Sequence, residues 1–261
     1  MNLYERSLNY LFNHFGKAMP DSVLLRVRYR TVFHEPLHLK NPKTFNEKIQ
    51  WLKLYDRNPE YHAMADKYAV RAYIGRVLGE KYLIPLLGVW QKAEDIDFKS
   101  LPDQFVLKCT HDSQSIVICH DKAKLDKEEA VRRLGEALKI DYSVLGREWA
   151  YHGIKPCIVA EELLTDESGD DLKDYKVFCF NGEPKFIQVD YDRFKGHKRR
   201  LYTTDWNLME TKITYPDDAD LIMPKPIFLD VERYSFFTSR LLYYRKPDLF
   251  WRTYILPWMW V

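Results

Sequence analysis

Hydrophobic residues recur at helical spacing through the first 80 residues of the chain. The pattern predicts an amphipathic helix near the N-terminus, followed by helices over residues 21–33, 44–56 and 65–82. Thr44, with Glu47 three residues later, forms a capping-box signature at the start of one of them. The spacing therefore predicts a helical N-terminal region.

From residue 82 onward the helical spacing of hydrophobic residues gives way to strict alternation and to short apolar runs, both of which are typical of β-strands. A single helix is expected at residues 126–138, and Asn181-Gly182 between two apolar runs is a strong hairpin signal. The predicted strands cover residues 82–90, 103–109, 114–120, 155–164, 174–180, 183–192 and 199–207. Helices followed by strands predict an α+β protein with largely antiparallel sheets.

The composition narrows the class of protein. The chain has 261 residues, of which 46% are hydrophobic and 30% charged, which is typical of a globular protein with a sizeable core. A net charge of +2 without clustering does not favour nucleic acid as a partner. Neither a signal-peptide core nor a run of about 18 apolar residues is found, so we expect a cytoplasmic protein without a spanning helix. The four cysteines lack a C-x-x-C pair and are interpreted as reduced core thiols, with a zinc site as the minor alternative.

Two lysines stand in apolar strands, where an unpaired ammonium would be costly. Lys108 lies in "FVLKC" and Lys176 in "DYKVFCF", each near a polar loop. Together they could clamp a polyphosphate, with "THDSQS" after Lys108 offering hydroxyl and backbone donors. The alternative is that both ammonium groups reach water at strand ends.

Two further groups of acids are candidates. Glu161 and Glu162 end a predicted strand and should point to opposite faces, so at most one faces a given pocket. Asp190 and Asp192 share one predicted strand face and could bind a divalent ion bridging a diphosphate, as in glycosyltransferases. Salt-bridged turn residues would give the same pattern.

Taken together, the segments "NPKTFNEKIQWLKLYDRNP", "ADKYAVRAYI", "FVLKCTHDS", "IKPCIVAEELL" and "DYKVFCFNGEPKFIQVDYDR" resemble the TupA-like ATP-grasp family. The resemblance covers about residues 40–226. It implies an ATP-grasp-like fold, with a helical region (1–80), a first antiparallel lobe (81–155) and a second (156–226). The aromatic-rich segment 227–261 does not match, so the fold is expected to be incomplete at its C-terminus.

The resemblance also implies roles for the residues singled out. Lys108 would bind phosphate from the first lobe, and Lys176 would be the phosphate lysine of the second lobe, with Arg193 facing the transferred phosphoryl group. The mobile loop over the phosphates would use His111, Asp112, Ser113 and Ser115, and the hinge holding adenine and ribose would use Glu161, Glu162 and Leu164. Relatives usually have glycine just after "HDS", where this chain has Gln114 and Ser115.

The family is associated with capsular polysaccharide synthesis. The resemblance therefore implies a ligase that activates a carboxylate, here of a uronic-acid saccharide, as an acyl phosphate with ATP and joins it to an amine. The late-strand acids that hold Mg²⁺ in ATP-grasp enzymes are not found after Pro226, which predicts impaired metal binding and turnover. A nucleotide-sugar glycosyltransferase and a non-catalytic nucleotide-binding remnant are the alternatives.

The segment from residue 227 differs from the rest of the chain. It lacks glycine, and 11 of its 35 residues are aromatic. A change of reading frame near this point is one hypothesis for the shift. The segment could pack onto its own domain or contact the inner face of the membrane peripherally.

Overall fold

The computed structural model describes residues 19–113, 115–164, 173–180, 183–192, 195–213, 215–218, 223, 225 and 253–254. The chain divides into two compact units, residues 1–162 and 163–261. The amphipathic helix expected near the N-terminus lies outside the described residues.

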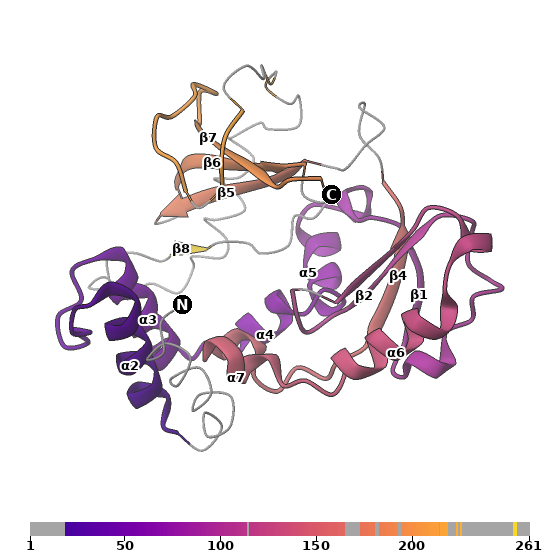
Figure 1. Ribbon diagram of the computed structural model, residues 1–261, viewed down its shortest axis with the longest axis horizontal. Coiled ribbons are helices and arrows are strands. Elements are labelled where there is room, and N and C mark those ends of the chain that lie inside the picture. Colours follow the sequence, from indigo (N-terminus) through magenta and orange to yellow (C-terminus); the bar gives the residue numbers. More distant parts are fainter. Residues whose placement is uncertain are drawn as a thin grey trace. The chain divides into compact units, whose positions relative to one another are not determined.

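Helices begin the first unit, as the periodicity predicts. They are α2 (Asp21–Phe33), α3 (Phe45–Tyr55), α4 (Glu60–Ala65) and α5 (Ala69–Val77). The capping box is confirmed, because the Thr44 hydroxyl accepts from the Glu47 N–H and the Glu47 carboxylate accepts from the Thr44 N–H. Helices α2 and α3 (Figure 1) share a small apolar cluster that includes Leu25 and Trp51.

The first unit then forms a four-stranded sheet. Its strands are β1 (Leu86–Trp90), β2 (Phe105–Cys109), β3 (Ile116–Cys119) and β4 (Ile158–Glu162), in the order β1-β4-β2-β3 with every pair antiparallel. Helix α6 (Lys127–Ala137) packs against one face, where Leu134 meets the fully buried Phe105 and Leu107. The remaining helical segments are α7 (Tyr142–Gly146) and the 3₁₀ turns η2 (Glu80–Tyr82), η3 (Ala93–Asp95), η4 (Lys122–Lys124) and η5 (Trp149–Tyr151).

Strand β4 pairs with both β1 and β2, so it belongs to the first sheet. The chain divides into its two compact units after Glu162; the lobe boundary at 155/156 that the resemblance implies stays a prediction. Sequence patterns show that a strand exists but not which sheet it joins, because that choice depends on hydrogen bonds to distant strands.

The second unit is built on another antiparallel sheet, with the order β7-β6-β5-β8. Its strands are β5 (Asp174–Phe180), β6 (Glu183–Tyr191), β7 (Lys198–Thr203) and β8 (Thr253–Tyr254). Asn181 and Gly182 lie outside the described residues, but Phe180 and Glu183 on either side of them pair directly, as a hairpin requires. Strands β5, β6 and β7 lie side by side (Figure 1).

The expected α+β class with two antiparallel sheets is thereby confirmed. Of the aromatic-rich segment 227–261, the structure describes only the two residues of β8. All four cysteines are free and buried, as predicted for core thiols. Among the described residues, every helix is too short or too polar to cross a membrane.

Candidate functional site

Lys108 lies on the face of the first sheet opposite α6. Phe105, Leu107 and Cys109 alternate into the apolar core, which turns Val106 and Lys108 to the other face. Lys108 pairs with Val159 in β4 and with Ile116 in β3, so it occupies the centre of the sheet rather than an exposed edge. The strand alone therefore does not carry its ammonium to water.

The counter-ion of Lys108 within the first unit is the carboxylate of Glu161. The two form an ion pair between β2 and β4, and their side chains are only 13% and 6% exposed. Arg71 of α5 binds the same carboxylate, with Nη1 2.9 Å from Oε1, and also donates from Nη2 to the Ile84 carbonyl at 2.6 Å. Two cations thus share one buried carboxylate, which leaves this group with a net positive charge. The predicted binding of triphosphate by Lys108 stays a prediction.

The two glutamates at the end of β4 differ as strand alternation predicts. Glu161 is buried on the Lys108 face, whereas the next residue, Glu162, is exposed. Leu164 follows the strand and is half-buried. The predicted hinge role of these three residues is not tested by their positions.

The loop that follows Lys108 turns much of its polar surface inward. His111 and Asp112 are buried, and the Asp112 carboxylate accepts hydrogen bonds from the hydroxyl and the backbone N–H of Ser115. Ser113 is exposed and its hydroxyl contacts the Tyr142 hydroxyl. Gln114 lies outside the described residues. The loop is therefore ordered around Asp112, while its predicted closure over phosphates stays a prediction.

Lys67, which the sequence analysis did not select, anchors this loop. It lies between α4 and α5, and its Nζ donates to the Cys109 carbonyl at 2.7 Å and to the Asp112 carbonyl. Its Nζ also lies 3.8 Å from Asp112 Oδ1. Burial lowers the pKa of Lys67 to about 8, although the charge of Asp112 acts in the opposite direction.

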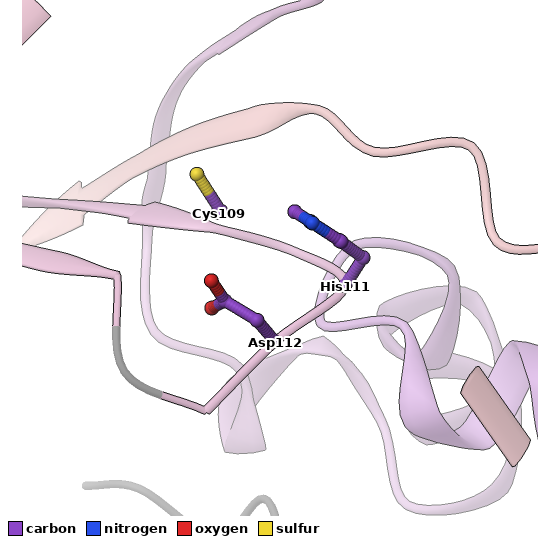
Figure 2. A group of neighbouring side chains, drawn as sticks. All are labelled: Cys109, His111 and Asp112. Atoms are coloured by element: carbon purple, nitrogen blue, oxygen red, sulfur yellow. The ribbon is translucent and has the colours of Figure 1, made fainter. Parts of the chain in front are cut away.

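Cys109, His111 and Asp112 form a compact group of potential metal ligands (Figure 2). One ligand atom from each lies within 4.8 Å of the others, and all three residues are buried. His111 Nε2 donates to the Ile140 carbonyl at 3.1 Å, and its Nδ1 has no hydrogen-bond partner among the described residues. Burial raises the pKa of the Cys109 thiol to about 12, so the sulfur is protonated at neutral pH and would bind a metal only by losing that proton.

The second unit holds its own charged group on one face of its sheet. Lys176 Nζ lies 2.7 Å from both Asp174 Oδ2 and Asp190 Oδ2. The register places Asp174 opposite Asp190 and Asp190 opposite Arg199, so these side chains share a face. The other face carries the apolar cluster that includes Ile187 and Val189.

Asp190 is the centre of this group and only 1% exposed. It accepts hydrogen bonds from Lys176, from Arg199 and, at 2.8 Å, from Gln188, and His197 Nε2 lies 3.1 Å from its Oδ1. Burial by itself would raise the pKa of Asp190, but the hydrogen bonds from Arg199 and Lys176 outweigh burial and hold that pKa below its usual value. Asp190 is therefore a permanent anion with a full set of nitrogen donors.

The structure does not place Asp190 and Asp192 as a matched pair of carboxylates. Strand β6 ends at Tyr191, and Asp192 has a left-handed backbone with φ of 50°. Its side chain is half exposed and lies 3.6 Å from Lys198. The expectation of a shared strand face was wrong, because alternation holds only while the backbone remains extended. Arg193, predicted to face the phosphoryl group, lies outside the described residues.

The fold and these groups define the class: an α+β protein with two antiparallel sheets, each carrying a half-buried lysine that pairs with a buried carboxylate. The family model for TupA-like ATPgrasp proteins matches residues 47–232. The chain therefore belongs to the TupA-like ATP-grasp family. The match reaches Glu232, slightly beyond residue 226, where the resemblance in the sequence was expected to end. No curated protein and no solved structure matches the chain.

Three cationic residues that contact the charged side chains described above were not predicted from the sequence, namely Lys67, Arg71 and Arg199. Lys67 and Arg71 are four residues apart within the helix predicted over residues 65–82. Their i, i+4 spacing was the available signal for a cationic pair, because residues four apart on a helix lie on the same face of that helix. Arg199 could have been found only by knowing the pairing of β6 with β7.

Proposed function

We propose that this protein binds ATP and acts as an ATP-grasp ligase of surface polysaccharide synthesis. The reaction would activate a carboxylate of a uronic-acid saccharide as an acyl phosphate and then form an amide with an amine. The single observation that carries the proposal is Lys108. It is held in the centre of a sheet by Glu161, with Arg71 adding a second positive charge.

The chemistry favours this assignment because phosphoryl transfer depends mainly on positioning and charge neutralisation. In the first unit, two cations share the Glu161 carboxylate, and the surplus positive charge attracts an anion. In the second unit, Lys176 Nζ lies 2.7 Å from two aspartates and could exchange one of these contacts for a phosphate oxygen.

ATP-grasp enzymes generally use Mg²⁺ together with ATP. Among the described residues of the second unit, the buried carboxylate of Asp190 accepts hydrogen bonds from Lys176 and Arg199, and the Lys176 ammonium lies 2.7 Å from Asp174 Oδ2. Because the Lys176 ammonium already lies between these two carboxylates, they do not fit a hydrated divalent cation. The proposed roles are confined to binding and orienting ATP.

Isothermal titration calorimetry with ATP tests the binding proposal. Lys108→Met and Lys176→Met should each weaken ATP binding by about tenfold or more, because each removes a charge-assisted contact. Lys124→Met and Lys185→Met are matched controls, since both lysines are exposed and pair with nearby acids. Unchanged affinity in the Lys108 and Lys176 variants, with circular dichroism showing an intact fold, would overturn the proposal.

Two further measurements separate the alternatives. Binding of a UDP-sugar that is lost in Asp192→Ala would favour a glycosyltransferase. Release of ADP from ATP in the presence of a uronic-acid acceptor would exclude a non-catalytic remnant. The proposal predicts ADP release and no dependence of ligand binding on Asp192.

A further inference from the structure

One residue, Lys67, fixes the course of the chain from Cys109 to Asp112. Its ammonium donates to the carbonyl groups at both ends of that segment, those of Cys109 and Asp112. Its backbone N–H donates to the carbonyl of Thr110, which lies between them, at 3.0 Å. Rotation of any of these peptide groups would break a contact with Lys67.

We propose that Lys67 is a positioning residue of the loop at 109–115 and that its ammonium is the cation held by the Cys109–His111–Asp112 group. The part of this inference that concerns nucleotide binding rests on the proposed function. Lys67 would act through the loop rather than by touching the nucleotide.

The arrangement of charge supports an internal ammonium rather than a metal ion at this group. The Lys67 side chain is only 10% exposed, so its charge needs a partner, and Asp112 supplies one negative charge 3.8 Å away. A divalent ion coordinated by Asp112 would lie a few ångströms from this ammonium and would be repelled by it. The ammonium already donates hydrogen bonds to the backbone carbonyls of Cys109 and Asp112. A metal ion bound by the three side chains would not supply hydrogen bonds to these two carbonyls.

The segment that Lys67 contacts also makes hydrogen bonds of its own. Thr110 donates from its N–H to the Cys157 carbonyl at 2.9 Å, and Cys109 donates to the Ser115 carbonyl at 3.0 Å. The Asp112 carboxylate that binds Ser115 would lose its counter-ion if Lys67 were removed. Because the same few residues make all of these contacts, loss of Lys67 should loosen the whole segment.

Hydrogen exchange of the amides at Cys109, Thr110 and Ser115 tests the anchoring directly, without any nucleotide. In Lys67→Met we expect these amides to exchange at least tenfold faster than in the wild-type protein. Lys53→Met is the matched control. Lys53 is also largely buried and donates to a carbonyl, that of Gly146 at 3.0 Å, and it lies near Glu148 rather than this loop. Equal exchange of the three amides in wild type and Lys67→Met would overturn the anchoring.

Calorimetric titration of the same proteins with ATP tests whether Lys67 affects nucleotide binding through the loop. Lys67→Met should weaken ATP binding by about tenfold, while Lys53→Met should leave it unchanged even if both variants lose similar global stability. Faster exchange with unchanged ATP affinity would overturn the link to nucleotide binding. If wild type itself does not bind ATP, the proposed function fails while the exchange result still decides the anchoring.

The metal content of the purified protein tests whether the cation at the Cys109–His111–Asp112 group is the Lys67 ammonium. One equivalent of bound zinc that is lost in His111→Ala would overturn that assignment.

Discussion

Arg199 of β7 faces Asp190 of β6 directly, and its guanidinium holds the carboxylate at two points. Nε lies 2.5 Å from Oδ1 and Nη2 lies 3.2 Å from Oδ2. Lys176 of β5 approaches Oδ2 from the other side at 2.7 Å. A carboxylate in the middle strand is therefore balanced by cations from both neighbouring strands, which ties three strands together.

Replacing Asp190 with Asn should destabilise the protein by about 3–5 kcal/mol, because it leaves the charges of Lys176 and Arg199 without this buried carboxylate. Urea denaturation followed by circular dichroism measures the change. Glu183→Gln in the same strand is the control, since Glu183 forms an exposed ion pair with Lys185 and should change little. An Asn variant as stable as wild type would show that the network does not hold the sheet together.

The ion pair of Lys108 and Glu161 predicts an asymmetry between its two partners. Glu161→Gln leaves both Lys108 and Arg71 without their shared carboxylate, whereas Lys108→Met leaves Glu161 still paired with Arg71. We therefore expect Glu161→Gln to lower the free energy of unfolding by about 3 kcal/mol or more, and Lys108→Met to lower it by less. The reverse order in urea denaturation would contradict the shared-carboxylate arrangement.

The hydrogen bonds of the Glu47 carboxylate should make the free energy of unfolding fall at acidic pH. Hydrogen bonds from the backbone N–H groups of Thr44 and Lys43 and from His38 lower its pKa to about 2, despite a burial effect that would raise it. The unfolded-state pKa of a glutamate is about 4.3. A lowered folded-state pKa contributes stability that is complete above the unfolded value and is lost as pH falls towards the folded value.

Comparing the unfolding free energy of wild type and Glu47→Gln between about pH 2 and pH 6 isolates this contribution. The difference between the two proteins should be largest near pH 6 and should shrink steadily below about pH 4.3. A difference that stays constant over this range would mean that the capping carboxylate does not titrate as the structure indicates.

The cysteines should resist alkylation in the folded protein. All four are buried and free. Burial raises the pKa of Cys109 to about 12 and that of Cys179 to about 11, so almost no reactive thiolate is present at neutral pH. Iodoacetamide followed by mass spectrometry should label none of them in native protein and all four after denaturation. Rapid labelling of Cys109 in the native protein would contradict the burial of this strand end.

The local structure followed from the sequence wherever short-range patterns decide it. Helix α2 begins and ends where the pattern predicts, and Thr44 and Glu47 form their capping box, because both depend on residues within one turn. The hairpin of β5 and β6 was likewise visible in the Asn-Gly signal. Strand alternation predicted that Glu161 and Glu162 point to opposite faces, and the structure adds that Glu161 is the buried one.

The sequence by itself determined helix α2, the capping box of α3, the α+β class, the family and the two lysines that stand in apolar strands. Only the tertiary structure decided the partners of those lysines: Glu161 and Asp190, together with Arg71 and Arg199, come from segments far along the chain. It also placed β4 in the first sheet and ended β6 before Asp192. The physical reason is that a buried charge is stabilised by whichever opposite charge the fold brings within a few ångströms, and sheet pairing rather than sequence spacing sets that distance.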